Sequence, residues 1–150
     1  MKKLTSKTGI TLLAIVVYMT ATAFAQKGKE KVEKDKVLDK KIFVIDLTET
    51  GKKKAKAEPD EISFANNKFK SKVMADEKFV ADLYIVTVDS SSGEKVVTFE
   101  STLKNDGGEE LLWNGTVKGD DIEGTAVLSK KGKTKKEYEF SGSLKQKKKK

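Results

Sequence analysis

From residue 41 to residue 145, hydrophobic and polar residues alternate with a period of two, in short runs separated by Gly, Asn, Asp and Ser. This period puts one face of a β-strand in a core and the other face in solvent. No segment of this region keeps the 3.6-residue period of a helix over a helical length. The predicted strands are residues 42–48, 62–65, 68–73, 83–88, 96–103, 111–117, 122–128 and 136–144.

Most of the predicted strands are joined by short turns. One of these, Asn66-Asn67, is a tight turn that makes a hairpin. Two connections are longer. Residues 51–59 form a charged loop, and residues 74–81 contain Met74, Lys78 and Ala81 at helical spacing. The second connection is therefore expected to be one short helix or an irregular crossover.

Eight strands joined in sequence by hairpins predict an all-β domain that is a single antiparallel up-and-down β-barrel of about eight strands, with at most one short helix. Closure into a barrel leaves no free strand edge. A two-sheet sandwich is the alternative, because the two longer connections could serve as Greek-key crossovers.

The first 25 residues predict export. Lys2, Lys3 and Lys7 precede an apolar run at residues 10–19, and Ala23-Phe24-Ala25 gives the small residues that a signal peptidase reads. We expect cleavage before Gln26 and a secreted or periplasmic protein. The predicted organisation is a signal peptide at 1–25, a flexible charged leader at 26–40, a barrel at 41–145 and a lysine-rich tail at 146–150.

The chain contains no Cys, no His and no Arg. Ser-His-Asp and Cys-His catalysis, the usual zinc and copper sites and the bidentate arginine clamp are therefore excluded. Asp106, Glu109 and Glu110 do not have the spacing of a calcium loop, and a hairpin turn with acidic neighbours accounts for them. We expect no metal, no cofactor, no catalytic residue and no enzymatic activity, with a hydrolase built on paired carboxylates as the remote alternative.

The formal charge of +8 lies mostly in tails and loops, because the signal contributes three lysines and residues 147–150 are all lysine. Without arginine, or aromatic residues among the lysines, nucleic-acid binding is not expected. The lysine runs at 52–54, 130–136 and 147–150 would give at most a weak attraction to anionic surfaces. We expect a monomer.

Three predicted strands each carry a glycine on the face that also carries large apolar residues. The inward positions include Trp113, Gly115 and Val117 on one strand, with Gly124 and Gly142 at matching places on the next two. Glycine weakens a strand, so matched inward glycines indicate a steric requirement. They either make a bend that neighbours fill, or leave room for Trp113 or a ligand.

The stretch from Trp113 to Thr125 (WNGTVKGDDIEGT), followed by Tyr138-Glu-Phe-Ser-Gly142, resembles the final hairpins of small exported bacterial β-barrels of lipocalin-like, calycin type. The resemblance covers residues 64–144. The Gly-x-Trp signature that opens true lipocalins is absent from this chain. The resemblance implies a closed barrel whose mouth holds a small apolar ligand.

Two functions follow as expectations. The first is a non-enzymatic barrel that binds a small apolar ligand near Trp113, Tyr84, Phe99 and Phe140. The second is a protein-interaction or envelope-associated module that binds, for example, an envelope protein through its exterior and loops. The interior distinguishes them, since a cavity of a few hundred Å³ supports the first and a filled interior supports the second.

Overall fold

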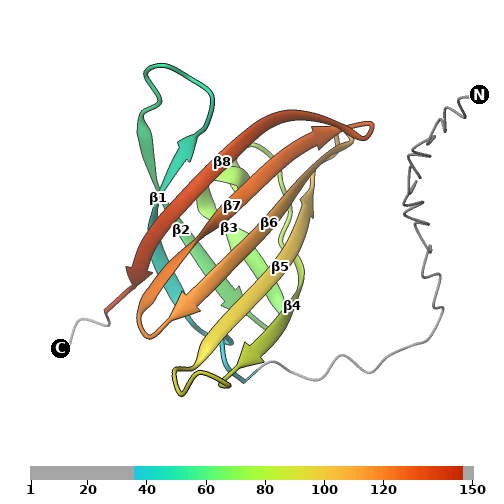
Figure 1. The fold of residues 1–150 in the computed structure, drawn as a ribbon. Helices are drawn as coiled ribbons and strands as arrows, with labels where there is room; N and C mark the ends of the chain where they lie inside the picture. The colour runs from blue at the N-terminus through green and yellow to red at the C-terminus, as the bar shows by residue number, and fades with distance from the viewer. Residues whose placement is uncertain (1–35, 147–150) are drawn as a thin grey trace, which may run out of the picture. The chain divides into compact units, whose positions relative to one another are not determined.

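The computed structural model describes residues 36–146 of the chain. The predicted signal peptide, residues 26–35 of the leader and residues 147–150 of the tail lie outside the described residues. The chain forms a closed barrel of eight antiparallel strands in sequence order (Figure 1). The strands are β1 (Ile42–Glu49), β2 (Ala57–Ala65), β3 (Lys68–Ser71), β4 (Asp82–Asp89), β5 (Val96–Lys104), β6 (Glu109–Lys118), β7 (Asp121–Lys130) and β8 (Lys133–Leu144), and one short helix, α1 (Lys72–Asp76), follows β3.

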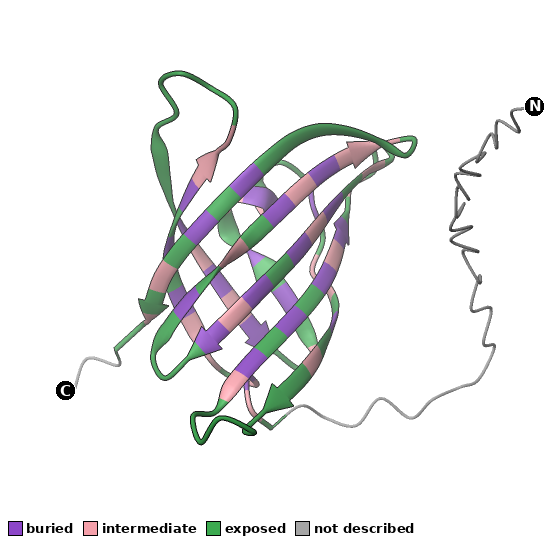
Figure 2. Cartoon of the chain, in the orientation of Figure 1, coloured by how far each residue is buried: buried purple, intermediate pink, exposed green. Residues whose placement is uncertain are grey.

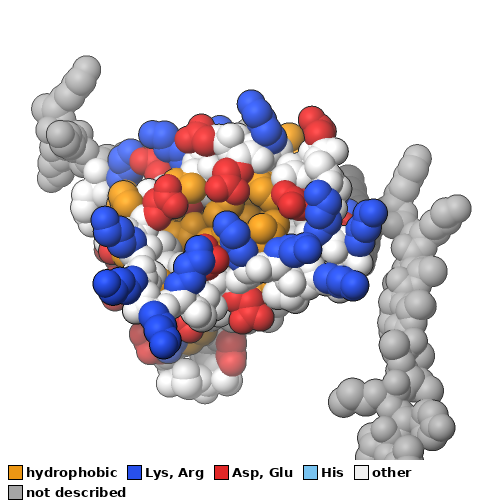
Figure 3. All heavy atoms as spheres, turned by 90° about the horizontal axis from the view of Figure 1, so that it is seen from above, with side chains coloured by type: hydrophobic (Ala, Val, Ile, Leu, Met, Phe, Trp, Pro, Cys, Tyr) orange, Lys and Arg blue, Asp and Glu red, His pale blue; other side chains and the backbone are white. Residues whose placement is uncertain are grey.

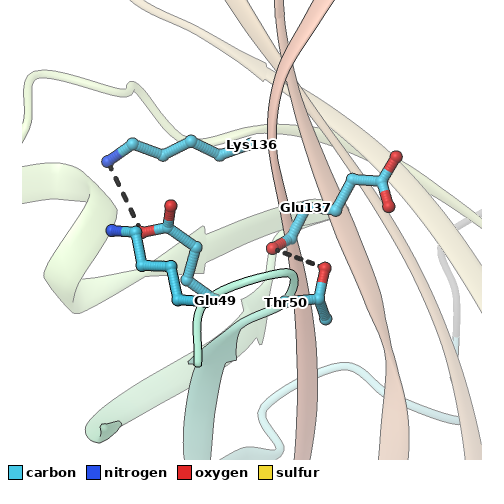
Figure 4. Close-up of polar contacts among 5 residues, drawn as sticks. Glu49, Thr50, Lys136 and Glu137 are labelled. Atoms are coloured by element: carbon cyan, nitrogen blue, oxygen red, sulfur yellow. Dashed lines mark hydrogen bonds and ion pairs between the residues drawn. The ribbon is translucent and has the colours of Figure 1, made fainter. Parts of the chain in front are cut away.

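The pairing of the first strand with the last closes the barrel. β1 and β8 pair from Phe43↔Leu144 to Glu49↔Tyr138. At the upper end of this seam, the backbone N–H and the hydroxyl of Thr50 both donate to the carbonyl oxygen of Glu137, at 2.8 and 3.2 Å. Lys136 lies 3.8 Å from the Glu49 carboxylate beside it (Figure 4). The barrel is therefore confirmed over the sandwich, and it is consistent with a lipocalin-like fold.

Buried and exposed residues alternate along the strands (Figure 2). This is the period of two in the sequence, because neighbouring side chains of a strand point to opposite faces of the sheet. The hydrophobic core includes eight aromatic side chains that are at most 4% exposed. These are Phe43, Phe64, Phe69, Phe79, Tyr84, Phe99, Trp113 and Phe140.

The region between β2 and β4 differs from the prediction. β2 begins at Ala57, so the end of the predicted loop 51–59 is strand. β3 ends at Ser71, and α1 begins at Lys72, two residues before the predicted helical segment 74–81. Asp60 explains the change at β3. Its buried carboxylate accepts hydrogen bonds from the Ser71 hydroxyl at 2.6 Å and from the Val73 N–H at 3.0 Å, which turns the chain out of the sheet.

The described chain ahead of β1 also belongs to the barrel. Leu38 is fully buried in the core, and the Lys40 N–H donates to the carbonyl oxygen of Phe64 at 2.7 Å. The predicted boundary at residue 41 therefore falls later than the structural one, because Leu38 lies in a charged stretch whose composition resembles that of a leader. Of the residues that the structure describes, none forms a helix long and apolar enough to cross a membrane.

Candidate functional site

The four candidate ligand residues lie in one aromatic cluster inside the barrel. Trp113 packs on Phe140 with ring centroids 5.1 Å apart. Phe64 lies between Tyr84 and Phe99, at 5.0 and 4.9 Å from their rings. Such separations are those of rings in direct contact. The structure thus brings the four candidate residues together, with other aromatic rings such as Phe64 packed between them.

Trp113 is fully buried, as its inward position predicts. Its indole Nε1 is buried and has no hydrogen-bond partner among the described residues. A buried N–H group without an acceptor costs about 1 to 3 kcal/mol. It is one feature of the interior that a ligand or a water molecule with an acceptor atom would satisfy.

The inward glycines let rings and backbone approach closely. A Cβ atom at Gly115 would overlap the ring of Phe99, and one at Gly124 would lie 2.7 Å from both the Phe140 ring and the Gly115 Cα atom. At Gly142 a Cβ atom would lie 2.6 Å from the Ile45 Cα atom. Neighbouring side chains therefore fill the space beside Gly115 and Gly124. This agrees with the first of the two explanations given for these glycines, in which neighbours occupy the space.

A hollow lies on the outside of the barrel, on the wall formed by β1, β5, β6, β7 and β8. It has a volume of about 720 Å³, and the backbone at Gly115 and Gly124 with the rings of Phe99 and Phe140 forms its floor. Its sides are outward-facing polar residues. These are Asp46, Thr48, Thr98, Asn114, Thr116, Glu123, Thr125, Glu139 and Ser141. We call this hollow, with its floor and sides, the wall groove.

Strand register explains how these residues meet. Thr98 lies opposite Thr116, which lies opposite Glu123. Glu123 lies opposite Ser141, and Ser141 lies opposite Asp46. A second row lies two residues along each strand and contains Asn114, Thr125, Glu139 and Thr48.

The wall groove carries negative charge that no described residue neutralises. Asp46, Glu123 and Glu139 are exposed, and none of them makes an ion pair or a side-chain hydrogen bond with the described residues. Among the described residues that line the groove there is no lysine.

The upper end of the barrel has a different character. Hydrophobic side chains gather in its middle, surrounded by lysine, aspartate and glutamate side chains (Figure 3). Tyr138 lies near this end and is 8% exposed. Its burial, followed by the negative charges of Glu77 and Glu49, raises the pKa of the Tyr138 hydroxyl to about 12. The phenol stays neutral at physiological pH and offers no anionic group.

Glu109 and Glu110, which follow the β5–β6 turn, have structural partners. The Asn105 side chain accepts from the Glu109 N–H and donates to the Glu109 carboxylate, both at 3.0 Å, and Glu110 pairs with Lys104 at 2.9 Å. Within residues 36–146, no group of three or more acidic side chains is placed to hold a metal ion.

Sequence reasoning missed the wall groove. Its residues were recognised only as the solvated faces of predicted strands, because nothing in a single strand shows that its acids meet those of its neighbours. The signal that could have found it is the near absence of lysine from these outward positions. Compared with protein-family models, curated proteins and solved structures, the chain matches none.

Proposed function

We propose that the protein is an exported, non-enzymatic barrel that binds a cationic peptide segment on its outer wall. The observation that carries this proposal is the wall groove, which combines a ligand-sized hollow with three carboxylates that form no ion pair with a described residue. Ligand sites in proteins typically have about 300 to 1,000 Å³. The proposal develops the second of the two functions expected from the sequence.

The chemistry of the groove favours amino groups over anions. Each of Asp46, Glu123 and Glu139 can accept a charge-assisted hydrogen bond, and the hydroxyl groups between them add neutral acceptors. Exposed charge pairs are worth roughly 0.2 to 1 kcal/mol each, so affinity has to come from several at once. An extended lysine-containing peptide meets that requirement, because its amino groups are spaced along a chain.

Calorimetric titration with tetralysine tests the proposal. We expect binding at low ionic strength that weakens as salt is added, because exposed charges are screened over about 10 Å at 0.1 M salt. Replacing Glu123 and Glu139 together by glutamine should weaken it about tenfold.

The matched control is the pair Glu94→Gln and Asp106→Asn, which removes the same charge from exposed turns away from the groove. The control should keep the affinity. Equal loss in both double variants would show attraction by net charge alone, and equal heat with tetraglycine would exclude recognition of the amino groups.

The second candidate is the small apolar ligand in the interior, and the unpaired indole N–H of Trp113 specifically favours it. The ring contacts oppose it, because Phe69 and Phe140 already lie 5.2 and 5.1 Å from the Trp113 ring and would have to move. Titration with the neutral dye N-phenyl-1-naphthylamine tests this candidate. Binding inside the barrel should quench Trp113 emission with saturation, whereas unchanged emission at millimolar dye contradicts it.

A further inference from the structure

Strand β4 has an edge that no other described strand covers. On one side it pairs with β5 from Tyr84↔Ser101 to Asp89↔Val96. On its other side β3 is only four residues long, and the pairing consists of Phe69↔Asp82 and Lys68↔Leu83. The Tyr84 N–H then donates to the carbonyl oxygen of Asn67, in the turn that ends the β2–β3 hairpin. β4 continues beyond that turn to Asp89.

The backbone groups of Val86 and Val88 face the uncovered side. In an antiparallel ladder, successive residues direct their N–H and C=O groups to opposite edges. The Tyr84 N–H points toward Asn67, so Val86 and Val88 point the same way, whereas Ile85 and Thr87 point toward β5. Each of the two valines therefore presents one donor and one acceptor that the described sheet leaves unused.

This edge lacks the features that usually protect an exposed strand. Residues 84–88 (YIVTV) contain no lysine, proline or glycine. The side chains of Leu83, Ile85 and Val88 are 51%, 68% and 44% exposed. The start of β2 is also not covered by β3, but it carries Glu58 and Pro59, which discourage strand pairing. Of these two uncovered stretches, only β4 is suited to accept a further strand.

We propose that two copies of the chain associate through this edge, β4 pairing antiparallel with β4 of the other copy about a two-fold axis at Thr87. In this register Val86 faces the partner's Val88, and each such pair exchanges two backbone hydrogen bonds. Ile85 faces the partner's Asp89, so no like charges lie opposite each other. Pairing through an isologous edge uses up the edge of both copies, which stops the association at a dimer.

A second copy suits the edge better than the chain ahead of Lys36 does. Residues 26–35 (QKGKEKVEKD) contain one larger apolar residue, Val32, and so offer little apolar surface. A second β4 places its Val88 and Val86 against Val86 and Val88 of the first copy, and burial of these side chains favours association. The inference replaces the expectation of a monomer and is independent of the wall groove.

Sedimentation equilibrium of the full chain, as recovered from a bacterial expression host, tests this inference. We expect a reversible monomer–dimer equilibrium. Ile85→Glu puts a second carboxylate opposite the partner's Asp89, and like charges directly opposite each other destabilise a strand pair. Val86→Pro removes an N–H from the open edge without removing a bond to β5. Each should raise the dimer dissociation constant at least about tenfold, which corresponds to about 1.4 kcal/mol.

The matched control is Val44→Glu. Val44 is 46% exposed on β1, a strand that is paired on both sides, so its replacement should leave the dissociation constant unchanged. Circular dichroism checks that each variant keeps its sheet, and if Val86→Pro fails to fold, Ile85→Glu decides.

A protein that stays monomeric up to millimolar concentration would overturn the inference, as would a dimer that neither variant weakens or that Val44→Glu weakens equally. Slow exchange of the Val86 and Val88 amide hydrogens in a monomer would show instead that another segment of the same chain covers the edge.

Discussion

At the level of single residues, Gly124 is an inward glycine that leaves no room for a side chain. A side chain there would collide with the carbonyl oxygen of Asn114 as well as with the Phe140 ring, and the backbone of a paired strand cannot move away cheaply. We expect Gly124→Ala to lower the free energy of unfolding by about 2 kcal/mol or more, in line with the cost of overpacking a core. Urea denaturation measures the change.

Gly107→Ala is the matched control for this substitution. Gly107 has no positive φ, and only the flexible side chain of Asn105 comes near its position, at 3.2 Å. Its replacement should change the urea midpoint little. Equal effects of the two substitutions would show that the inward glycines are not required for close approach.

Tyr138 predicts how stability depends on pH at the alkaline end. The folded state holds the phenolic proton up to about pH 12, whereas an unfolded tyrosine loses it near its model value of 10.0. Between those values the unfolded state binds fewer protons than the folded state, so the free energy of unfolding falls as pH rises. Below pH 10 this contribution is constant.

The chain has three tyrosines, so the pKa of Tyr138 is obtained as the difference between the ultraviolet tyrosinate titrations of the original chain and of Tyr138→Phe. Tyr138→Phe removes the titrating hydroxyl and keeps the ring, so the variant should lose less stability between pH 10 and pH 12 than the original chain. An unchanged pH profile in the variant would contradict the assignment.

At the level of elements, the junction of β3 and α1 depends on one carboxylate. The Ser71 hydroxyl donates to Asp60 and accepts from the Met74 N–H at 3.1 Å, so Ser71 caps the helix while Asp60 holds it. Asp60→Asn removes a charged acceptor from a site that is 4% exposed. We expect a loss of about 1 to 3 kcal/mol in the free energy of unfolding.

The cap and the carboxylate can be separated by experiment. Ser71→Ala removes the cap and should cost about 1 kcal/mol. Glu58→Gln, on the same strand but exposed, serves as the charge control and should cost little. A loss as large in Glu58→Gln as in Asp60→Asn would indicate a general effect of charge rather than the buried hydrogen bonds.

The same junction shows what the sequence could predict and what it could not. Residues 68–73 alternate without interruption, and alternation is a property of neighbouring residues, so the pattern predicts a strand through Val73. The chain leaves the sheet at Ser71 because Asp60, eleven residues earlier, lies beside it in space. The eight strands, the barrel and the burial of Trp113 followed from local pattern. The wall groove depends on which strands are neighbours and on their register, which local pattern does not contain.

For the whole molecule, the barrel is predicted to open first between β3 and β4. That seam has two residue pairs, whereas β6 and β7 have ten, from Glu109↔Lys130 to Lys118↔Asp121. Local opening is easiest where few interactions are lost. Hydrogen exchange should therefore be faster for amides on the seam side of β3 and β4 than for those between β6 and β7. Uniform protection of all strands would contradict this order.

The pairing of β1 with β8 has a consequence for the time course of folding. β1 is made early and its second partner is made last, because β8 occupies Lys133–Leu144 near the end of the chain. Contacts so distant in sequence make folding slow, typically milliseconds to seconds. Until β8 arrives, β1 and β7 each keep a bare edge that can pair with another molecule. A chain that stops before Lys133 is thus expected to aggregate. The twelve-residue strand β8 pairs with both open edges and closes the sheet into a barrel.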